Sequence, residues 1–482
     1  MLSAPTGDAP EFKTDERLRP GRFAALLAVL IIAAFPDVIF GARTFFYRDS
    51  GIFGYPIAYY HRESFWQGEM PLWNPLNNRG LPFLAQWNTM VLYPLSLFYV
   101  LFPLSWSLGV FCLLHLFLAG LGMYGLARQW TANKLAASVA GLAFAFNGLT
   151  LSCLKWPKNI ASLAWMPFVV WLTERGWREG GRKLVLAALA GAFQMLTGGP
   201  EIILLTWVFV GLLWISDLFA RRQMRGMIVA RFPCIILLVA GLAAIQLVPF
   251  LDLLKHSQRD ATFRDASWSL PLWGWANLFV PLFRSFPSHQ GVFAQLGQYW
   301  ISSYYMGIGL LALALAAPWL MSNRRTWLLA AVTAISLILS FGDAGLVFQW
   351  LRKLVPPLQI VRFPVKFVVL LVFTIPLMAA FAIARMRTMM NAGQAAASGP
   401  SWIVIAQTHY HPWRAYIHGK PKRLWRANHF AQAIEVPGGR SSVQLIYQDR
   451  AFVFGGVLSV LALGACGWLW FRRGRDVSAR AV

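Results

Sequence analysis

Long apolar runs, separated by short polar and often basic segments, dominate this chain. A straight membrane-spanning helix needs roughly 20 apolar residues, so the shorter runs must use amphipathic flanks or pack among neighbours. The run 88–104 is interrupted by Pro94 and Pro103 and predicts a re-entrant or interfacial segment. The pattern predicts a mostly α fold, a polytopic transmembrane helical bundle of about 11 spans, at residues 23–41, 106–127, 135–151, 160–174, 184–197, 200–219, 231–251, 306–321, 327–341, 366–386 and 451–471.

The chain after residue 386 follows a different pattern. Residues 387–401 are mostly small and predict a flexible linker, whereas residues 402–450 show short alternating runs separated by Gly and Pro, which is typical of β-strands. IHGKP and VPGGR are expected turns between these strands. We therefore expect a small β module, followed by a final membrane helix at 451–471 and a basic tail at 472–482.

Composition agrees with a membrane protein. Hydrophobic residues make up 57% and charged residues 13%, against about 25% charged residues in soluble domains. The net charge of +24 lies in short clusters between apolar runs rather than along one stripe, so we expect no nucleic acid partner. Four cysteines lie inside or beside apolar runs without ligand spacing, which supports neither a disulfide framework nor a zinc site.

The basic clusters predict the orientation, because loops on the cytoplasmic side carry an excess of Lys and Arg. They lie at 128–134, 175–183, 220–231, 323–325 and 385–387. The polar tail 1–22 has no cleavable signal pattern and is expected inside, so the membrane domain 23–386 would present the segments 42–87, 252–305 and 342–365 outward.

The helix count conflicts with this orientation at the C-terminal end. Starting inside, eleven spans leave the β module inside and the basic tail outside, against the positive-inside bias. Either one predicted span is wrong or an odd number of helices is absent near residues 387–401. Both alternatives stay open.

Two strings carry a family resemblance. RDSGIFGYPIAYYHRESFWQGEMPLWNPLNNRGLPFLAQWNTMVLYP, from Arg48 to Pro94, resembles the first external loop of the YfhO family of bacterial integral membrane proteins. HPWRAYIHGKPKRLWRANHFAQAIEVPGGRSSVQLIYQ is similar to the β module that ends many such chains. The family belongs with the glycosyltransferases of the C superfamily, which take sugars from polyprenyl-phosphate carriers.

The resemblance implies a shortened member of that family in the cytoplasmic (inner) membrane, with its β module and active site facing outward. Its expected partners are a polyprenyl-phosphate-linked sugar, membrane lipids and an envelope glycan or lipid acceptor. Motifs for soluble nucleotides, HExxH, DxD and nucleophile-elbow chemistry are missing from the sequence. We expect no cofactor beyond the lipid-linked donor and no metal site, although a divalent metal stays an open alternative.

Asp49 is the main catalytic candidate. Sugar transfer to a hydroxyl requires a carboxylate that takes the acceptor proton, and the resemblance gives this role to an acidic residue soon after the first helix. An ion pair with Arg48 or a turn cap is the alternative. Asp37, near the outer end of the first helix, and Glu69 are rivals, for which helix-end and loop-bracing roles are the alternatives.

The same loop supplies substrate-binding candidates. Trp73 and Trp87 are candidates to stack on a sugar face, and Arg48, Asn74 and Arg79 are candidates to contact the sugar or its phosphate. An ordered turn around Asn74 and a lipid-headgroup contact for Arg79 are the alternatives.

Further candidates lie beyond the first loop. In TGGPE, Glu201 falls in the first turn of a helix, where a capping role is the alternative, and the motif lacks the His that the resembling proteins carry there. In VRFPVKF, Arg362 and Lys366 are candidates to bind phosphate, with a headgroup anchor as the alternative. The segment 252–305 adds Arg259, Arg264, His256 and His289.

Two other functions fit parts of the pattern. A lipid or glycan transporter would be expected to show inverted repeats, and none is convincing here. A noncatalytic membrane scaffold is the other alternative. Convergence of Asp49, Arg362 and Lys366 on one outward cavity would favour an enzyme, because a scaffold does not need it.

Overall fold

The computed structural model describes residues 18–77, 79–257, 268–288, 292–354, 363–391, 394–397, 401–408, 413–427, 431–437 and 439–447. The predicted final helix, the basic tail and most of the N-terminal tail lie outside these ranges. So do the candidates Arg259, Arg264, His289 and Arg362. The chain forms two compact units, Met1–Arg385 and Met386–Val482, and each is described by itself.

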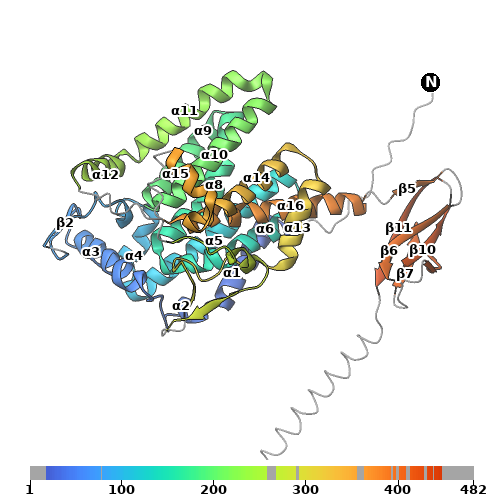
Figure 1. Ribbon diagram of the computed structural model, residues 1–482, viewed down its shortest axis with the longest axis horizontal. Helices are drawn as coiled ribbons and strands as arrows, with labels where there is room; N and C mark the ends of the chain where they lie inside the picture. The colour runs from blue at the N-terminus through green and yellow to red at the C-terminus, as the bar shows by residue number, and fades with distance from the viewer. Residues whose placement is uncertain are drawn as a thin grey trace, which may run out of the picture. The chain divides into compact units, whose positions relative to one another are not determined.

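Helices make up most of the first unit (Figure 1). Pro20, Pro36, Pro157 and Pro200 each begin a helix, where the missing N–H of proline costs no hydrogen bond. The helices are α1 (Pro20–Ala34), α2 (Pro36–Ile39), α3 (Tyr55–Trp66), α4 (Leu97–Leu101), α5 (Leu104–Thr131), α6 (Lys134–Ala145), α7 (Gly148–Ser152), α8 (Pro157–Glu179), α9 (Arg182–Leu196), α10 (Pro200–Ala220), α11 (Arg225–Leu242), α12 (Ala244–His256), α13 (Ile308–Leu320), α14 (Arg324–Ser340), α15 (Leu346–Leu354) and α16 (Val368–Asn391).

The mostly α architecture predicted from the apolar runs is confirmed. Within the described ranges, five helical stretches are long and apolar enough to cross a membrane: Leu104–Thr131, Lys134–Lys155, Pro200–Ala220, Arg222–Leu242 and Pro364–Thr388. The runs 23–41 and 306–321 contain the shorter apolar helices α1 and α13. The first of these runs is divided at Phe35, because Pro36 cannot continue the hydrogen-bonding pattern of α1 and starts α2.

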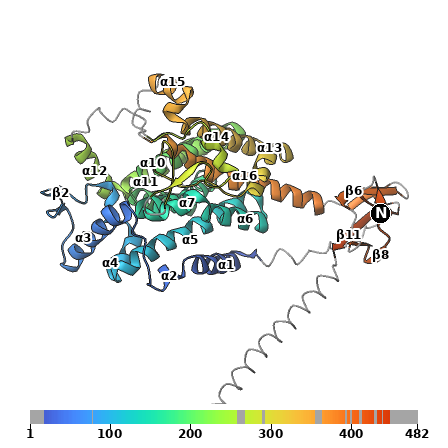
Figure 2. The same ribbon diagram turned by 60° about the horizontal axis from the view of Figure 1, so that its bottom comes forward.

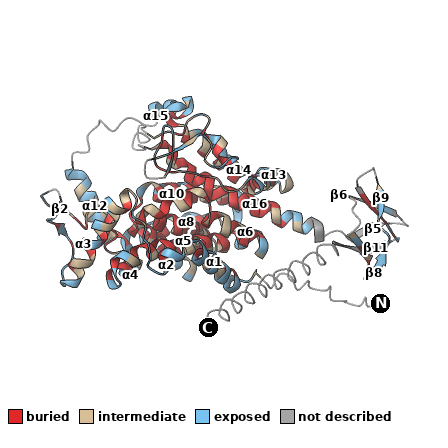
Figure 3. Cartoon of the chain, turned by 90° about the horizontal axis from the view of Figure 1, so that it is seen from below, coloured by how far each residue is buried: buried red, intermediate tan, exposed pale blue. Residues whose placement is uncertain are grey.

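The core of the first unit lies where α5, α6, α8, α10 and α16 pack together. Figure 3 shows α8 and α16 largely buried, whereas α12 and α15 are largely exposed. Phe373 of α16 contacts Phe144 and Phe209, with ring centroids 5.7 and 5.3 Å away. Gly120 and Gly141 let α5 and α6 approach closely, since a Cβ at Gly141 would lie 2.8 Å from the Gly120 carbonyl oxygen.

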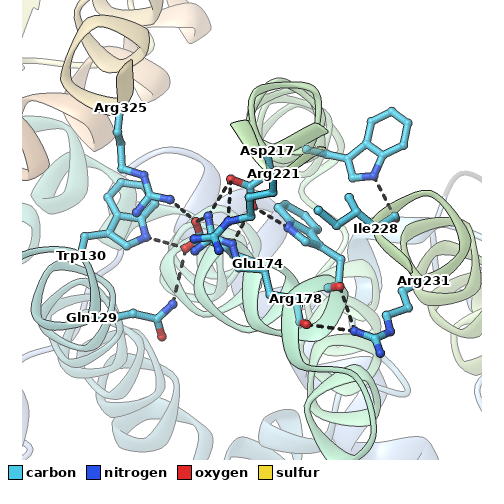
Figure 4. A network of polar contacts seen from close by, with 11 residues as sticks. Gln129, Trp130, Glu174, Arg178, Asp217, Arg221, Ile228, Arg231 and Arg325 are labelled. Atoms are coloured by element: carbon cyan, nitrogen blue, oxygen red, sulfur yellow. Dashed lines mark hydrogen bonds and ion pairs between the residues drawn. The ribbon is translucent and has the colours of Figure 1, made fainter. Parts of the chain in front are cut away.

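A buried ionic network ties the helices together at one end of this unit (Figure 4). Glu174 accepts a 2.6 Å hydrogen bond from Trp130 Nε1 and pairs with Arg178 at 2.6 Å and with Arg325. Arg178 pairs in turn with Asp217 at 2.6 Å. Four of the basic clusters expected on the inside therefore supply or adjoin this network. They lie at the same end of the unit, as clusters on one side of a membrane must.

The segments expected to face outward contain regular structure as well as loops. A π-helical turn, η2 (Ser50–Gly54), leads into α3 within 42–87, and α15 lies within 342–365. Short antiparallel ribbons join β1 (Trp73–Asn74) to β2 (Leu81–Pro82) and β3 (Ser285–Pro287) to β4 (Phe293–Gln295). Figure 2 shows α3 and α4 close together, in agreement with the Trp66 Nε1 bond of 2.8 Å to the Val100 carbonyl.

The second unit contains the predicted β module. One antiparallel sheet has the strand order β6-β10-β9 and the other β5-β11-β7-β8. Ala415, Ile417, Ile434 and Val436 form the core between them. The strands are β5 (Gln394–Ala397), β6 (Ser401–Thr408), β7 (Trp413–Ile417), β8 (Lys420–Lys422), β9 (Trp425–Ala427), β10 (Ala431–Val436) and β11 (Gly439–Tyr447).

The segment expected as a linker, 387–401, is partly structured. Helix α16 continues to Asn391, where Arg387, Met389 and Met390 are good helix formers. Strand β5 follows and pairs with β11. The difference arises because a segment of small residues, here Gln394–Ala397, can still pair its backbone with a neighbouring strand.

Candidate functional site

Asp49 stands at the entry to the π-helical turn η2. Its Oδ2 accepts a 2.6 Å hydrogen bond from Trp156 Nε1, which fixes the orientation of the carboxylate. The turn is held by Ser50, whose Oγ donates to the Phe45 carbonyl at 2.7 Å. Short π-helical turns are rare and occur frequently at functional sites. The sequence after the first helix thus places a carboxylate on an ordered turn.

A cavity of about 260 Å³ opens beside Asp49. This volume is below the roughly 300–1,000 Å³ of pockets for drug-sized ligands, so it suits a small polar group better than a whole lipid. Its lining combines a carboxylate, an ammonium, an amide and a phenol with apolar side chains: Asp49, Phe53, Gly54, Ile57, Ala58, Asn88, Met90, Tyr99, Leu108, Trp156, Pro157 and Lys158.

Two lysines flank Trp156 in the string KWPK. Lys158 lines the cavity from the first turn of α8. The Lys155 ammonium lies 4.3 Å from the centroid of the Trp156 ring and 5.9 Å from that of Tyr47. Such cation–π contacts hold an ammonium in place. The structure therefore puts two lysine side chains near Asp49, and burial lowers the pKa of both.

A third lysine reaches the same region from α16's entry turn, η11 (Pro364–Phe367). The Lys366 ammonium lies 2.5 Å from Glu201 Oε1. Lys158 interacts electrostatically with both members of this pair and with Asp49. Trp300 connects the two sides, since its ring stacks on Trp156 at 6.1 Å and lies 5.6 Å from the Lys366 ammonium. Asp49, Glu201 and Lys366 thus converge.

Tyr99 supplies a neutral hydroxyl to the cavity. Burial raises the pKa of Tyr99, although a hydrogen bond from Ser96 acts in the opposite direction. Its hydroxyl lies 3.2 Å from His61 Nδ1. Burial lowers the pKa of His61 to about 4, against a smaller opposing effect of the Val91 backbone. Both groups are neutral near pH 7. Burial lowers the pKa of Lys158, and the neighbouring Glu201 and Asp49 carboxylates act in the opposite direction.

The rival carboxylates lie elsewhere. Asp37 is in the first turn of α2 and pairs with Arg43 at 3.5 Å, and both side chains are exposed. Glu69 is exposed just beyond the end of α3. Neither belongs to the described residues that line the cavity.

Three substrate-binding candidates shape the ribbon of β1 and β2. The Trp73 ring lies over Gly80, where a Cβ would approach it to 2.6 Å. Asn74 Oδ1 accepts a 2.9 Å bond from the Leu76 backbone N–H, which is the ordered turn expected as the alternative role. Arg79 has a positive φ of 65° in the same ribbon. These positions are away from the cavity lining.

Trp87 connects the first loop to the turn before α10. Its Nε1 donates to the Met195 carbonyl at 2.6 Å, and its ring lies 4.9 Å from Phe250. A Cβ at Gly198, which has a φ of +70°, would lie 1.9 Å from the Trp87 carbonyl oxygen. The TGGPE motif therefore needs glycine at this position, because the loop of Trp87 and Asn88 packs directly against its backbone. That packing holds Asn88 at the cavity.

Two further candidates make local contacts. Arg48 Nη1 donates to the Tyr299 carbonyl at 3.0 Å, which ties the first loop to the segment 252–305. His256 lies at the exposed end of α12, where its Nδ1 is 2.9 Å from the Asp252 carbonyl. In the part of the chain that the structure describes, no group of three or more His, Cys, Asp or Glu side chains is arranged to hold a metal ion.

Sequence reasoning missed five hydrogen-bonding or charged side chains at the cavity: Asn88, Tyr99, Lys155, Trp156 and Lys158. The available signal was KWPK, which places two cations around an aromatic residue and a helix-starting proline between two apolar runs.

The fold and the cavity define a multi-pass helical membrane protein with a charged, partly aromatic pocket at one end of its bundle. No family model and no curated protein matches the sequence. The crystal structure of ArnT from Cupriavidus metallidurans bound to undecaprenyl phosphate is similar with a TM-score of 0.37 and 16% identity, over 77% of this chain and 78% of that chain. So low a similarity assigns neither fold nor function to this chain.

Proposed function

We propose that this protein is a membrane glycosyltransferase that moves a sugar from a polyprenyl-phosphate carrier to a hydroxyl of an envelope glycan or lipid acceptor. The observation that carries the proposal is the shared cavity of Asp49 and Lys158, with Lys155 and the Lys366–Glu201 pair beside it. A carboxylate next to several cations is the arrangement that transfer from a phosphate carrier needs. The resemblance of the first loop to YfhO proteins points to the same chemistry.

In this proposal Asp49 acts as general base. It takes the proton of the acceptor hydroxyl as the hydroxyl oxygen attacks the anomeric carbon, and the bond from that carbon to the phosphate oxygen breaks. The hydrogen bond from Trp156 holds the carboxylate for this step. The carrier phosphate leaves with the bonding electrons, so it needs fixed positive charge nearby.

Lys158 and Lys155 are the proposed phosphate ligands. Lys366 contributes less free charge, because Glu201 lies 2.5 Å from its ammonium and neutralises much of it. Lys366 and Glu201 are then better suited to hold the ends of α10 and α16 beside the cavity. Arg362, predicted as a phosphate ligand, lies outside the described residues and stays a prediction.

The cavity faces the outer side of the cytoplasmic membrane in this proposal. The ionic network of Glu174 and Asp217 adjoins the basic clusters that are expected inside. Lys158 and Glu174 lie sixteen residues apart on α8, or about 24 Å along the helix axis. That separation approaches the roughly 30 Å thickness of the hydrocarbon core. A carrier could reach the cavity laterally with its phosphate at the outer boundary.

Binding of polyprenyl phosphate to the purified protein tests the phosphate site. Lys158→Gln should weaken binding roughly tenfold or more, because a charge-assisted hydrogen bond is lost, and Lys158→Arg should retain most of the affinity. Lys255→Gln, at an exposed position in the last turn of α12, is the matched control and should bind like wild type. Unchanged affinity in Lys158→Gln would contradict the site.

A further inference from the structure

The sheet β6-β10-β9 of the second unit has one face turned away from its core. Along β10, Ile434 and Val436 belong to the core, so the alternate residues Ala433 and Glu435 lie on the other face. Residues directly opposite in an antiparallel pair share a face. Trp402 pairs with Glu435, and both Val404 and Trp425 pair with Ala433. These five residues therefore share the outer face.

The two tryptophan rings meet over the middle strand. Strands β6 and β9 flank β10, and such strands are about 9.6 Å apart in a sheet. The ring centroids of Trp402 and Trp425 are only 6.1 Å apart, at an interplanar angle of 75°. Ala433 between them is small and only 5% exposed, whereas Trp402 and Trp425 remain 55% and 42% exposed. The rings thus form a raised aromatic corner.

Charged groups of both signs border this corner. The Arg423 guanidinium lies 4.0 Å from the centroid of the Trp425 ring, so its N–H donors are held beside the aromatic surface. Glu435 is exposed and lies opposite Trp402 in the strand pairing, where its carboxylate can accept hydrogen bonds. An apolar surface is therefore flanked by a donor that a cation–π contact holds and by an exposed carboxylate acceptor.

We propose that this face, formed by Trp402, Val404, Ala433, Glu435 and Trp425, is a saccharide-binding surface for β-linked pyranosides of the gluco configuration. Their equatorial substituents leave axial C–H groups that stack on an aromatic ring, while the hydroxyls at the rim both donate and accept hydrogen bonds. Arg423 and Glu435 match that rim. The proposal does not depend on the transferase activity, since it concerns the second unit alone.

A lipid contact and edge protection are alternative roles for the exposed tryptophans, and both fit less well. An anionic lipid surface would be attracted by Arg423 but repelled by Glu435, which lies opposite Trp402, so the two charges together do not favour it. Simple edge protection, by which sheets avoid pairing with other sheets, uses charged residues and proline rather than exposed tryptophan. That device is present elsewhere in the unit, at Lys420, Pro421 and Lys422 of the short strand β8.

Saturation-transfer NMR of the full-length protein in phospholipid nanodiscs tests the proposal with cellotetraose and chitotetraose as probes. Wild type should give transfer to the pyranose C–H protons of at least one probe. Trp402→Ala and Trp425→Ala should each reduce affinity roughly tenfold, because a stacking ring is lost. Glu435→Gln, which preserves shape and packing, should reduce affinity several-fold and keeps the test valid if an alanine variant unfolds.

Trp319→Ala is the matched control. Trp319 is 75% exposed and forms a similar edge-to-face pair with Trp327 at 6.4 Å, but in the first unit. It should bind like wild type. Absence of transfer to both probes in wild type, or equal transfer in Trp402→Ala, Trp425→Ala and Glu435→Gln, would overturn the proposal. A smaller quenching by brominated phospholipid in Trp402→Phe than in wild type would also overturn it, because the face would then contact lipid.

Discussion

Lys158 and Lys366 differ in how much charge each can offer a phosphate. Lys366 is paired with Glu201, whereas Lys158 lines the cavity and interacts with that pair only through longer-range electrostatics. Position along the sequence favoured Lys366, because it lies at the entrance of a predicted span. The contacts favour Lys158, since a cation that is already paired gains less from binding an anion. Burial lowers the pKa of Lys158, so a bound phosphate would also favour the charged form of this side chain.

His61 makes stability depend on pH. Its pKa is lowered to about 4 by burial, against about 6.5 in an unfolded chain. Because the folded-state pKa is the lower one, the unfolded state binds the proton more readily, and stability falls as pH drops from about 6.5 toward 4. The loss should be on the order of 3 kcal/mol at the acid end.

Thermal unfolding of wild type and His61→Gln between pH 7 and 4 checks this expectation. The variant should start less stable, because a buried ring is removed, but its unfolding free energy should decline less steeply with acid. Parallel pH profiles for the two proteins would show that His61 does not titrate as described.

Asp49, Glu201 and Lys366 could be proposed from the sequence because each is a charge beside a long apolar run. Their proximity in space could not be proposed from the sequence, since Glu201 and Lys366 are 165 residues apart and only helix packing brings them together. The composition of a short connection such as KWPK does not say whether it is buried. That is why Lys155 and Lys158 were missed.

Among the elements, α8 connects the two polar assemblies of the first unit. Lys158 lies in its first turn and Glu174 near its other end. The Glu174 side chain is buried, accepts from Trp130 and pairs with two arginines. Removing the Glu174 charge leaves the positive charge of the two arginines without its counterion.

Glu174→Gln should therefore lower the unfolding free energy by about 3–5 kcal/mol, measured by denaturation in detergent. Glu179→Gln on the same helix is the matched control. Glu179 pairs with Arg175 at 2.7 Å but is half-exposed, so its loss should cost about 0–1 kcal/mol. Equal effects of the two substitutions would mean that the network contributes no more than a surface pair.

Local sequence predicted some elements well. IHGKP becomes the turn between β7 and β8, where His418 and Gly419 have φ values of 50° and 77°, as a two-residue hairpin turn requires. The turn η2 and helix α3 were not predicted, because their residues are aromatic and polar without a clear period. Contacts such as Trp66 to Val100 stabilise α3 instead.

At the scale of the whole molecule, the cavity and the ionic network occupy opposite ends of the same helices. Lys158 and Glu201 lie in the first turns of α8 and α10, and Glu174 and Asp217 lie sixteen residues further along each helix. The helical bundle is thereby polar at both ends and apolar between them. Labelling of introduced cysteines tests which end faces which side.

In a background with Cys234 and Cys466 replaced by Ser, Arg222→Cys and Arg182→Cys should react with an impermeant thiol reagent only in permeabilised cells. Glu69→Cys should react in intact cells. All three positions are exposed in the structure. Labelling of Arg222→Cys from outside would reverse the orientation and place the cavity on the cytoplasmic side.

The central claim is that Asp49 activates the acceptor for sugar transfer. Mass spectrometry should compare envelope glycans and lipid-linked sugars of cells that lack this protein with cells carrying wild type, Asp49→Asn, Asp37→Asn or Glu69→Gln. Wild type and both control variants should restore a sugar modification that the deletion lacks. Asp49→Asn should fold and bind the carrier, but its transfer should fall by roughly 10²–10⁴-fold. Restoration of the modification to wild-type levels by Asp49→Asn would contradict the account.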